Sequence, residues 1–290
     1  MSKSRIWLAG ALAALLAAGG WLQAHRPIIA RPALWEISGP AGQKGWLLGT
    51  IHALPRPARW HDKALDGALA ASDRLVVEIA DLNNDAATAA AFGALAHSPD
   101  LPPLDQRLAP AQRPALARAL ARIGRSPTDF TDTETWAAAL MLANGGHDAG
   151  EAANGIDRAL LRENRKPVVE LEGARGQLSV FDRLPEADQR SLLAAVLAGD
   201  NDDESEAMAE AWARGDMATI TAETRKGLLA VPALRAALYT GRNRDWATRI
   251  DALLRGGAHP FVAVGAGHMA GGDGLPALLA ARGWRVRRLQ

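Results

Sequence analysis

Apolar positions along the chain follow two different periods, which predicts a sheet whose strands are separated by helices. Short apolar or β-branched runs are typical of buried strands, and they occur at 34–37, 45–48, 73–80, 167–172, 261–265 and 284–289. The Gly- and Pro-containing turn at 38–44 predicts that the first two runs pair as a hairpin. Stretches with apolar residues three or four apart are typical of helices, and they occur at 61–72, 185–199, 203–215, 242–255 and 275–282.

A longer helical region separates two of the strands. From about residue 82 to 165, Ala-, Leu- and Arg-rich segments with helical spacing are interrupted by Pro-rich stretches. The pattern therefore predicts an α/β fold with a central, mostly β-sheet core, flanking helices and a long helical insertion. The insertion lies between the strands that carry Glu78 and Glu172.

Composition limits the possible chemistry. The 290 residues are 48% hydrophobic, which is ample for one packed domain, and we expect that domain at 34–290 after a linker at 25–33. The net charge of +1 gives no reason to expect nucleic acid as a partner. Cysteine is absent, which excludes disulfides, thiolate metal sites and cysteine nucleophiles. Any metal ion must be held by His, Asp or Glu.

The N-terminal segment has the features of a targeting sequence. Lys3 and Arg5 precede an apolar and small-residue run at 6–22, and Ala24 offers a cleavage point. Residues 1–24 are therefore predicted to be a signal peptide or an N-terminal membrane anchor. We expect an exported protein, either periplasmic or anchored to the inner membrane and facing the periplasm. Membrane association would then occur through this segment.

Two distant segments share one motif, an apolar run that ends in Gly-x-x-His. The first ends at Gly49 and His52, and the second at Gly265 and His268. Each predicts a buried strand that presents an imidazole at its carboxyl end, where α/β sheets bind ligands. The two histidines therefore indicate one shared site. The alternative is that both are structural histidines bonded to the backbone. A third copy, ending at His259, precedes its strand and is interpreted as a turn.

Three carboxylates occur in or beside apolar runs. Glu78 follows Val76 and Val77, and burying it is costly unless it is paired, protonated or bound to a metal. Glu170 and Glu172 are two residues apart, which predicts that they share one strand face. The alternative for all three is exposure to solvent.

Two imidazoles and these carboxylates suit a divalent ion such as zinc, manganese or cobalt. They equally suit metal-free hydrolysis in which a histidine or glutamate acts as general base. The sequence contains no H-E-x-x-H, G-x-S-x-G or P-loop motif, which argues against ordinary zincins, nucleophile-elbow esterases and P-loop enzymes.

These residues resemble the TraB/GumN family, which is related to the Tiki proteins and more distantly to erythromycin-esterase-like and ChaN-like proteins. The resemblance runs from about residue 35 to 289, and the two end blocks carry it most specifically. The blocks that carry it are Trp35–Glu36, Gly45–Pro55, Val76–Glu78, Gly155–Asp157, Lys166–Glu172 with Gln177, Arg242–Asn243 with Trp246, and Val264–Gly271 with Gly274–Leu275.

The resemblance implies a site but no substrate. Tiki relatives are described as metal-dependent proteases that use the two Gly-x-x-His motifs. Carried over position by position, the implied site has a core, two further charged residues and supporting groups. These are His52, Glu78 and His268; Glu172 and Arg242; and Asp157, Asn243, Gly49 and Gly265.

We therefore expect an exported hydrolase of this type, a metal-dependent peptidase with both histidines in one cleft. His52, His268 and Glu78 would hold the ion, a spare carboxylate from Glu78 or Glu172 would act as general base, and Arg242 would stabilise the oxyanion. The sequence does not identify the substrate, and a peptide or a small molecule is expected. One alternative is a non-catalytic exported protein that binds haem or a cell-envelope ligand, and another is a metal-independent esterase-like hydrolase.

Overall fold

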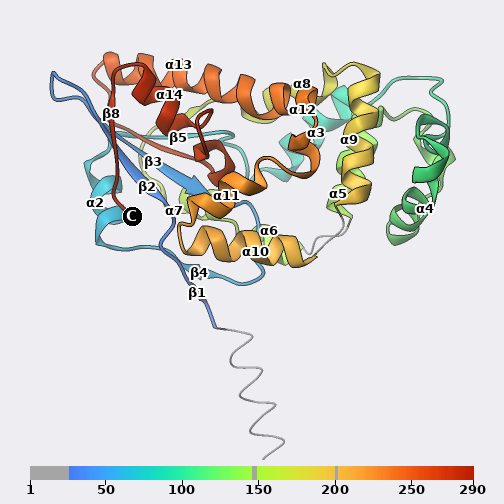
Figure 1. Cartoon of the computed structure of the whole chain (residues 1–290), viewed down its shortest axis with the longest axis horizontal. Coiled ribbons are helices and arrows are strands. Elements are labelled where there is room, and N and C mark those ends of the chain that lie inside the picture. The colour runs from blue at the N-terminus through green and yellow to red at the C-terminus, as the bar shows by residue number, and fades with distance from the viewer. Residues whose placement is uncertain (1–25, 146–148, 200–201) are drawn as a thin grey trace, which may run out of the picture.

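The computed structural model describes residues 26–145, 149–199 and 202–290. The predicted targeting segment at 1–24 lies outside the described residues. A six-stranded mixed sheet forms the centre of the fold, in the order β6-β5-β7-β3-β2-β8 (Figure 1). Its strands are β2 (Leu34–Ser38), β3 (Lys44–Thr50), β5 (Arg74–Val77), β6 (Val168–Glu170), β7 (Pro260–Gly265) and β8 (Arg285–Arg288).

Four neighbouring strands of the sheet run parallel to one another. β3 pairs with β7, β7 with β5, and β5 with β6, all in parallel. β2 pairs antiparallel with both β3 and β8, which completes the predicted hairpin and closes the other edge. Parallel register aligns Thr50 with Gly265, so the chain leaves both strands at the same level. A separate two-stranded sheet pairs β1 (Ile28–Ile29) with β4 (Ala58–Arg59).

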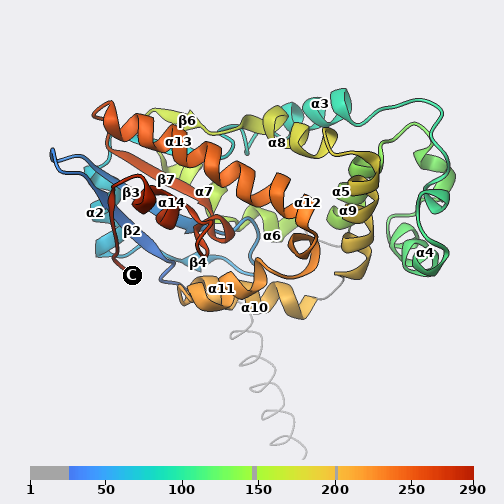
Figure 2. The same ribbon diagram turned by 45° about the horizontal axis from the view of Figure 1, so that its top comes forward.

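Alternate residues of the strands enter two apolar clusters, one on each face of the sheet. On one face, Leu75 and Phe261 pack with residues of α2 (Lys63–Ala71), α7 (Ile156–Glu163), α10 (Asp202–Ala213) and α11 (Met217–Glu223). On the other face, Val76 and Val262 pack with α13 (Gly241–Arg255) and α14 (Leu275–Ala281). Figure 2 shows α13 and α14 along one side of the sheet and α10 and α11 near the opposite side. Helices therefore cover both faces, which confirms the predicted α/β class.

The region between β5 and β6 is helical, as predicted, and later helices complete its core. Its elements are α3 (Asp85–Leu95), η1 (Leu104–Arg107), η2 (Pro110–Gln112), α4 (Arg113–Arg122), η3 (Pro127–Phe130), α5 (Thr135–Asn144), α6 (Ala149–Ala153) and α7. A third apolar cluster joins α4 and α5 to α8 (Gly173–Asp182), α9 (Glu186–Ala198) and α12 (Pro232–Arg235). These helices lie beyond the end of the sheet in Figure 1. The remaining short elements are η4 (Gly227–Ala230), the π-helical turn η5 (Ala236–Thr240) and η6 (Ala266–Met269).

Two strands are shorter than the sequence predicts. β5 ends at Val77 and β6 ends at Glu170, although apolar runs suggested strands at 73–80 and 167–172. The chain turns at Gly173, whose φ of +71° lies in the left-handed region that favours glycine. Glu78 and Glu172 consequently lie just beyond their strands rather than within them.

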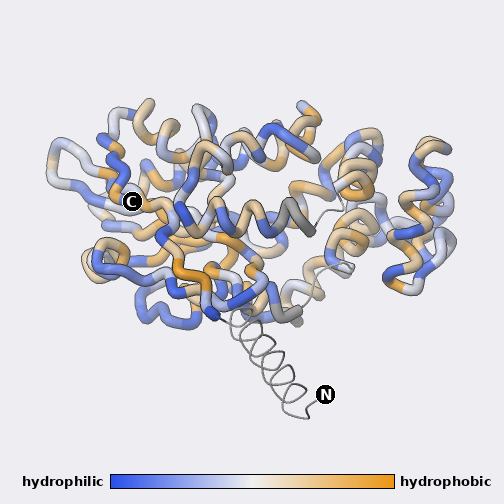
Figure 3. Tube along the Cα trace, turned by 60° about the horizontal axis from the view of Figure 1, so that its bottom comes forward, coloured by the Kyte–Doolittle hydropathy of each residue, from blue (hydrophilic) through white to orange (hydrophobic). Residues whose placement is uncertain are grey.

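Apolar and polar positions alternate along the helices in Figure 3, as expected for helices with one buried face. Among the helices of the described segments, none combines the length and the apolar character needed to cross a bilayer.

Candidate active site

The four parallel strands deliver four site residues to one edge of the sheet. His52 lies two residues beyond β3, and Glu78 directly follows β5. Glu172 lies two residues beyond β6, and His268 belongs to the η6 turn that follows β7. Carboxyl ends of parallel strands meet at one edge, so residues 216 positions apart in sequence become neighbours.

Three of these side chains converge on Gly265. A methyl group placed on Gly265 would lie 3.4 Å from His52 Nε2, 3.5 Å from Glu78 Oε1 and 3.7 Å from His268 Cδ2. Both imidazoles and the carboxylate therefore surround one point, and the absence of a side chain at residue 265 leaves that point open. Gly49 has a different role, because a methyl group there would lie 3.0 Å from Ala266 Cα. Its missing side chain lets β3 approach the turn that carries His268.

His52 is oriented by Asp157 at the start of α7. Its Nδ1 lies 2.7 Å from Asp157 Oδ2, and the Thr50 hydroxyl donates to Asp157 Oδ1. An ionised carboxylate only accepts hydrogen bonds, so Nδ1 of His52 carries a hydrogen. Nε2 is then the ring nitrogen that faces Gly265. The Asp157 side chain is 7% exposed and that of His52 is 62% exposed, so solvent and ligands reach the ring while its anchor stays buried.

His268 is oriented by Asn243 on α13. Its Nδ1 lies 2.6 Å from Asn243 Oδ1, and Asn243 Nδ2 donates to the Asp273 carbonyl at 2.8 Å. The second bond fixes the amide, so Oδ1 is the acceptor and His268 Nδ1 is the donor. The ring of His268 lies 4.4 Å from that of Trp246, which packs beside it. In both histidines Nε2 is the nitrogen without a protein partner in the described contacts. His52 directs Nε2 itself at Gly265, and His268 directs the adjacent Cδ2 there.

Glu78 is buried and paired with a cation. Its Oε1 accepts from the Gly265 amide at 2.9 Å, and its Oε2 accepts from Arg242 Nη2 at 2.9 Å. The side chains of Glu78 and Arg242 are 7% and 11% exposed. Pairing offsets the cost of burying the carboxylate, which was one of the conditions expected from the sequence.

Arg242 also forms an ion pair with Glu172. Its Nε and Nη2 donate to Glu172 Oε1 and Oε2, both at 2.8 Å, in a bidentate pair. Trp246 Nε1 donates to Glu172 Oε1 at 3.0 Å, and the guanidinium lies 4.7 Å from the centre of the Trp246 ring. Both oxygens of Glu172 are therefore engaged in holding Arg242. Glu170, by contrast, is exposed and accepts from the Ala80 amide at 2.6 Å, away from this group.

The surroundings shift the pKa values of His52 and His268 in opposite directions. The Asp157 carboxylate beside Nδ1 raises the pKa of His52 to about 9. Burial lowers the pKa of His268 to about 4, although the Glu78 charge opposes this shift. Burial also tends to raise the pKa of Glu78, but His268, His52 and Arg242 outweigh it and lower that pKa. At neutral pH and without a metal ion, His52 is charged, His268 is neutral and Glu78 is ionised.

The donor chemistry around Gly265 fits a divalent cation. Two imidazole Nε2 atoms and one carboxylate oxygen are a common ligand set for zinc and related ions. Each imidazole has the outer hydrogen-bond partner that metal-binding histidines usually have. In residues 26–145, 149–199 and 202–290, no three His, Asp or Glu side chains already form a compact metal-holding group. The fit therefore rests on ligand type and orientation.

Several contributors to the site were not singled out in the sequence. Thr50 lies inside the first motif and bonds Asp157, and Asp273 fixes Asn243 through its backbone carbonyl. Tyr239 belongs to the π-helical turn before α13, donates to the Ala270 carbonyl and lies 5.8 Å from the His268 ring. A π-helical turn has no reliable sequence signal, although such turns are frequent at functional sites.

Most of the chain matches a known protein family. The model of the TraB/PrgY/gumN family matches residues 33–288. The chain belongs to the TraB/PrgY/gumN family. Membership in this family confirms the resemblance that the motifs indicated.

Two bacterial relatives extend the match to individual proteins. The uncharacterized protein YbaP of Shigella flexneri is 29% identical over 261 residues, which are 84% of this chain and 90% of YbaP. YbaP of Escherichia coli K12 matches over the same share of each chain with the same identity. No solved structure matches this chain. The TraB/PrgY/gumN assignment therefore identifies relatives of similar length whose own names state no activity.

Proposed function

We propose that this chain is a hydrolase whose two Gly-x-x-His histidines hold a divalent metal ion, and that its substrates are peptides. The observation that carries the proposal is the convergence of His52, Glu78 and His268 on the open space beside Gly265. The choice of peptides rests on the resemblance to Tiki proteins. When bound, the ion would acidify a coordinated water and polarise the scissile carbonyl.

The protein groups have separable tasks in this proposal. His52 and His268 would bind the ion through Nε2, and Asp157 and Asn243 accept from Nδ1 and so direct Nε2 to the site. At neutral pH, binding at His52 would release the proton that Nε2 carries in the metal-free protein. Arg242 provides a fixed positive charge beside the reacting atoms, where negative charge develops in acyl transfer. Glu172 is a positioning residue, because both of its oxygens hold Arg242.

Glu78 faces the same space through Oε1, and its lowered pKa keeps it ionised. An ionised carboxylate can complete the ligand set or accept a proton from water. Glu78→Gln separates the two roles. Loss of metal content together with activity assigns Glu78 as a ligand, whereas loss of activity with metal retained assigns it as the general base.

The main experiment measures bound metal by elemental analysis and cleavage of a peptide library by mass spectrometry. His52→Ala and His268→Ala are expected to lose both the metal and at least about 100-fold of the cleavage rate. His259→Ala is the matched control, because His259 ends the third Gly-x-x-His and is half-exposed before β7. Undiminished cleavage in both site variants would refute the proposal.

A metal-free hydrolase is the second candidate, and one observation favours it. Arg242 already supplies a cation to Glu78 at 2.9 Å, so the carboxylate is compensated without a metal ion. A strong chelator distinguishes the candidates. Full activity after metal removal would select the metal-free mechanism, and activity restored by zinc, manganese or cobalt would select the first.

We further propose that residues 1–24 direct the protein out of the cytoplasm, as a signal peptide or an anchor. The basic start and apolar run at 6–22 support this placement. Fusing residues 1–33 to an alkaline phosphatase that folds only outside the cytoplasm should give activity. The same fusion without residues 1–24 should be inactive, and equal activity of the two fusions would contradict the placement.

A further inference from the structure

A cavity lies at the opposite end of the parallel strands from the candidate active site. Leu75 and Phe261, the residues near the starts of β5 and β7, line it on the sheet side. Leu69 on α2 and Leu160 on α7 line the helix side. Its volume is about 340 Å³, which lies within the usual range for small-molecule sites.

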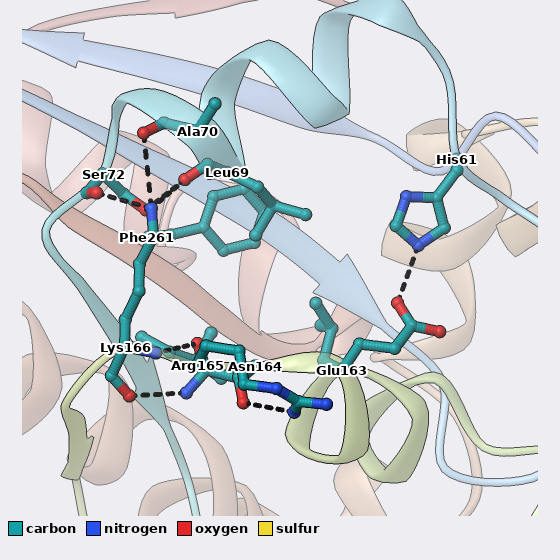
Figure 4. Close-up of a pocket in the computed structure, with 11 residues that line it drawn as sticks. His61, Leu69, Ala70, Ser72, Glu163, Asn164, Arg165, Lys166 and Phe261 are labelled. Atoms are coloured by element: carbon teal, nitrogen blue, oxygen red, sulfur yellow. Dashed lines mark hydrogen bonds and ion pairs between the residues drawn. The ribbon is translucent and has the colours of Figure 1, made fainter.

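Two polar ties between the α2 side and the α7 side frame this cavity (Figure 4). On one side, Lys166 Nζ donates to the carbonyls of Leu69 and Ser72, and to Ser72 Oγ at 2.9 Å. On the other side, His61 Nε2 lies 2.9 Å from Glu163 Oε2. Figure 4 shows the Phe261 ring between these ties. These contacts link the α2 side to the α7 side at two places, and the cavity wall between them is apolar.

The charged lining residues are already hydrogen-bonded within the protein. Lys166 directs its hydrogens at the carbonyl end of α2, where a cation is favourable. His61 is held between Glu163 and Asp66, whose Oδ1 lies 2.6 Å from His61 Nδ1. Among the lining residues, all within the described chain, the remaining charged side chain is Arg165, which is exposed and bonds the Arg162 and Asn164 carbonyls. The Lys166 hydrogens and the His61 ring nitrogens are therefore already bonded within the protein, and the walls between these groups are apolar.

We infer that this cavity is a binding site for an uncharged ligand with an apolar body, either an aromatic ring system or a medium-length chain. Its volume is about twice that of an apolar protein cavity known to hold benzene. A charged head group would lose its hydration and would compete with the hydrogen bonds that Lys166 and Glu163 already make. This site is separate from the candidate active site and does not depend on the proposed hydrolase activity.

The test uses the full chain and N-phenyl-1-naphthylamine, an uncharged dye whose emission rises in apolar surroundings. Ala70 is an exposed residue of α2 at the cavity, and Ala71 is its exposed neighbour outside the lining. Ala70→Trp and Leu69→Gln are expected to weaken dye binding at least about 10-fold by filling the cavity or making its wall polar. Ala71→Trp is the matched control and should bind as the unsubstituted chain does.

Competition experiments test the charge requirement. Decanol should displace the dye at a concentration at least about 10-fold lower than decanoate, because the ammonium hydrogens of Lys166 already bond protein oxygens and Arg165 lies on the exposed rim. Absence of saturable dye binding, or equal affinity in Ala70→Trp, Leu69→Gln and Ala71→Trp, would overturn the site. Displacement by decanoate as effective as that by decanol would overturn the assignment of an uncharged ligand.

Discussion

The amide of Asn243 determines which nitrogen of His268 carries hydrogen. Asn243 donates to the Asp273 carbonyl through Nδ2, so its Oδ1 must accept from His268 Nδ1. The side chain is fully buried, and no rotation of the amide preserves both bonds. A residue outside both Gly-x-x-His motifs thereby sets the chemical state of the second one.

Replacing Asn243 should therefore affect stability and the site together. Asn243→Ala leaves the Asp273 carbonyl and His268 Nδ1 without their partner, which should lower the free energy of unfolding by about 1–3 kcal/mol. Urea denaturation checks the stability. Metal affinity or activity should fall about 10- to 100-fold in the same variant. A fully stable, fully active variant would show that the orientation of His268 is set elsewhere.

Arg242 is the buried cation of the site, and its removal should be far costlier than removal of a surface arginine. Arg242→Met leaves Glu78 and Glu172 as adjacent buried carboxylates, so we expect a loss of about 3–5 kcal/mol. Arg249→Met on the same helix breaks an ion pair with Asp245 in which both side chains are 54% exposed. That control should change stability by less than about 1 kcal/mol. Similar unfolding midpoints for the two variants would contradict the described burial.

The glycines of the two motifs should respond differently to the same substitution. In Gly265→Ala the new methyl group has ordinary contact distances of 3.4–3.7 Å, so the fold should survive while the space between the imidazoles is filled. We expect a folded protein with at least about 10-fold less activity. Gly49→Ala meets Ala266 at 3.0 Å and should cost about 1–3 kcal/mol through crowding. Circular dichroism with activity assays separates these outcomes, and full activity of Gly265→Ala would argue against chemistry at that point.

The pH dependence of the metal-free protein should reveal the partner of His52. NMR titration should give a pKa of about 9 for His52, and Asp157→Asn should lower it towards the ordinary value of 6.5. Since folding raises this pKa, the stabilisation from His52 is complete below pH 6.5 and is lost as pH rises through 9. His268 contributes a pH dependence of the opposite sign. Because folding lowers its pKa to about 4, its contribution to stability is present above pH 6.5 and is lost as pH falls through 4. An unchanged His52 titration in Asp157→Asn would contradict the assignment.

Much of the fold was predictable because strands and helices leave strong local patterns. The apolar runs that end at Gly49 and Gly265 became β3 and β7, side by side and in parallel. The β2–β3 hairpin and the helical region between β5 and β6 also follow from the sequence. The family assignment followed from the same motifs and was confirmed by the match over residues 33–288.

Other features depend on contacts between distant residues and have no local pattern. The bidentate hold of Arg242 on Glu172 joins residues 70 positions apart, and nothing near either residue indicates the pairing. The spacing of Glu170 and Glu172 predicted a shared strand face. The turn at Gly173 instead leaves Glu170 exposed and directs Glu172 to Arg242.

The cavity between α2 and α7 is connected to the candidate active site through two strands of the sheet. β5 extends from Leu75 in the cavity wall to Val77, next to Glu78, and β7 extends from Phe261 to Gly265. A strand of four residues is roughly 13 Å long, so the cavity lies about one strand length from the candidate active site. A compound bound in this cavity would contact β5 and β7, and the carboxyl ends of these two strands lead directly to Glu78 and to the turn that carries His268. An inhibitor that binds this cavity would therefore act without occupying the substrate site.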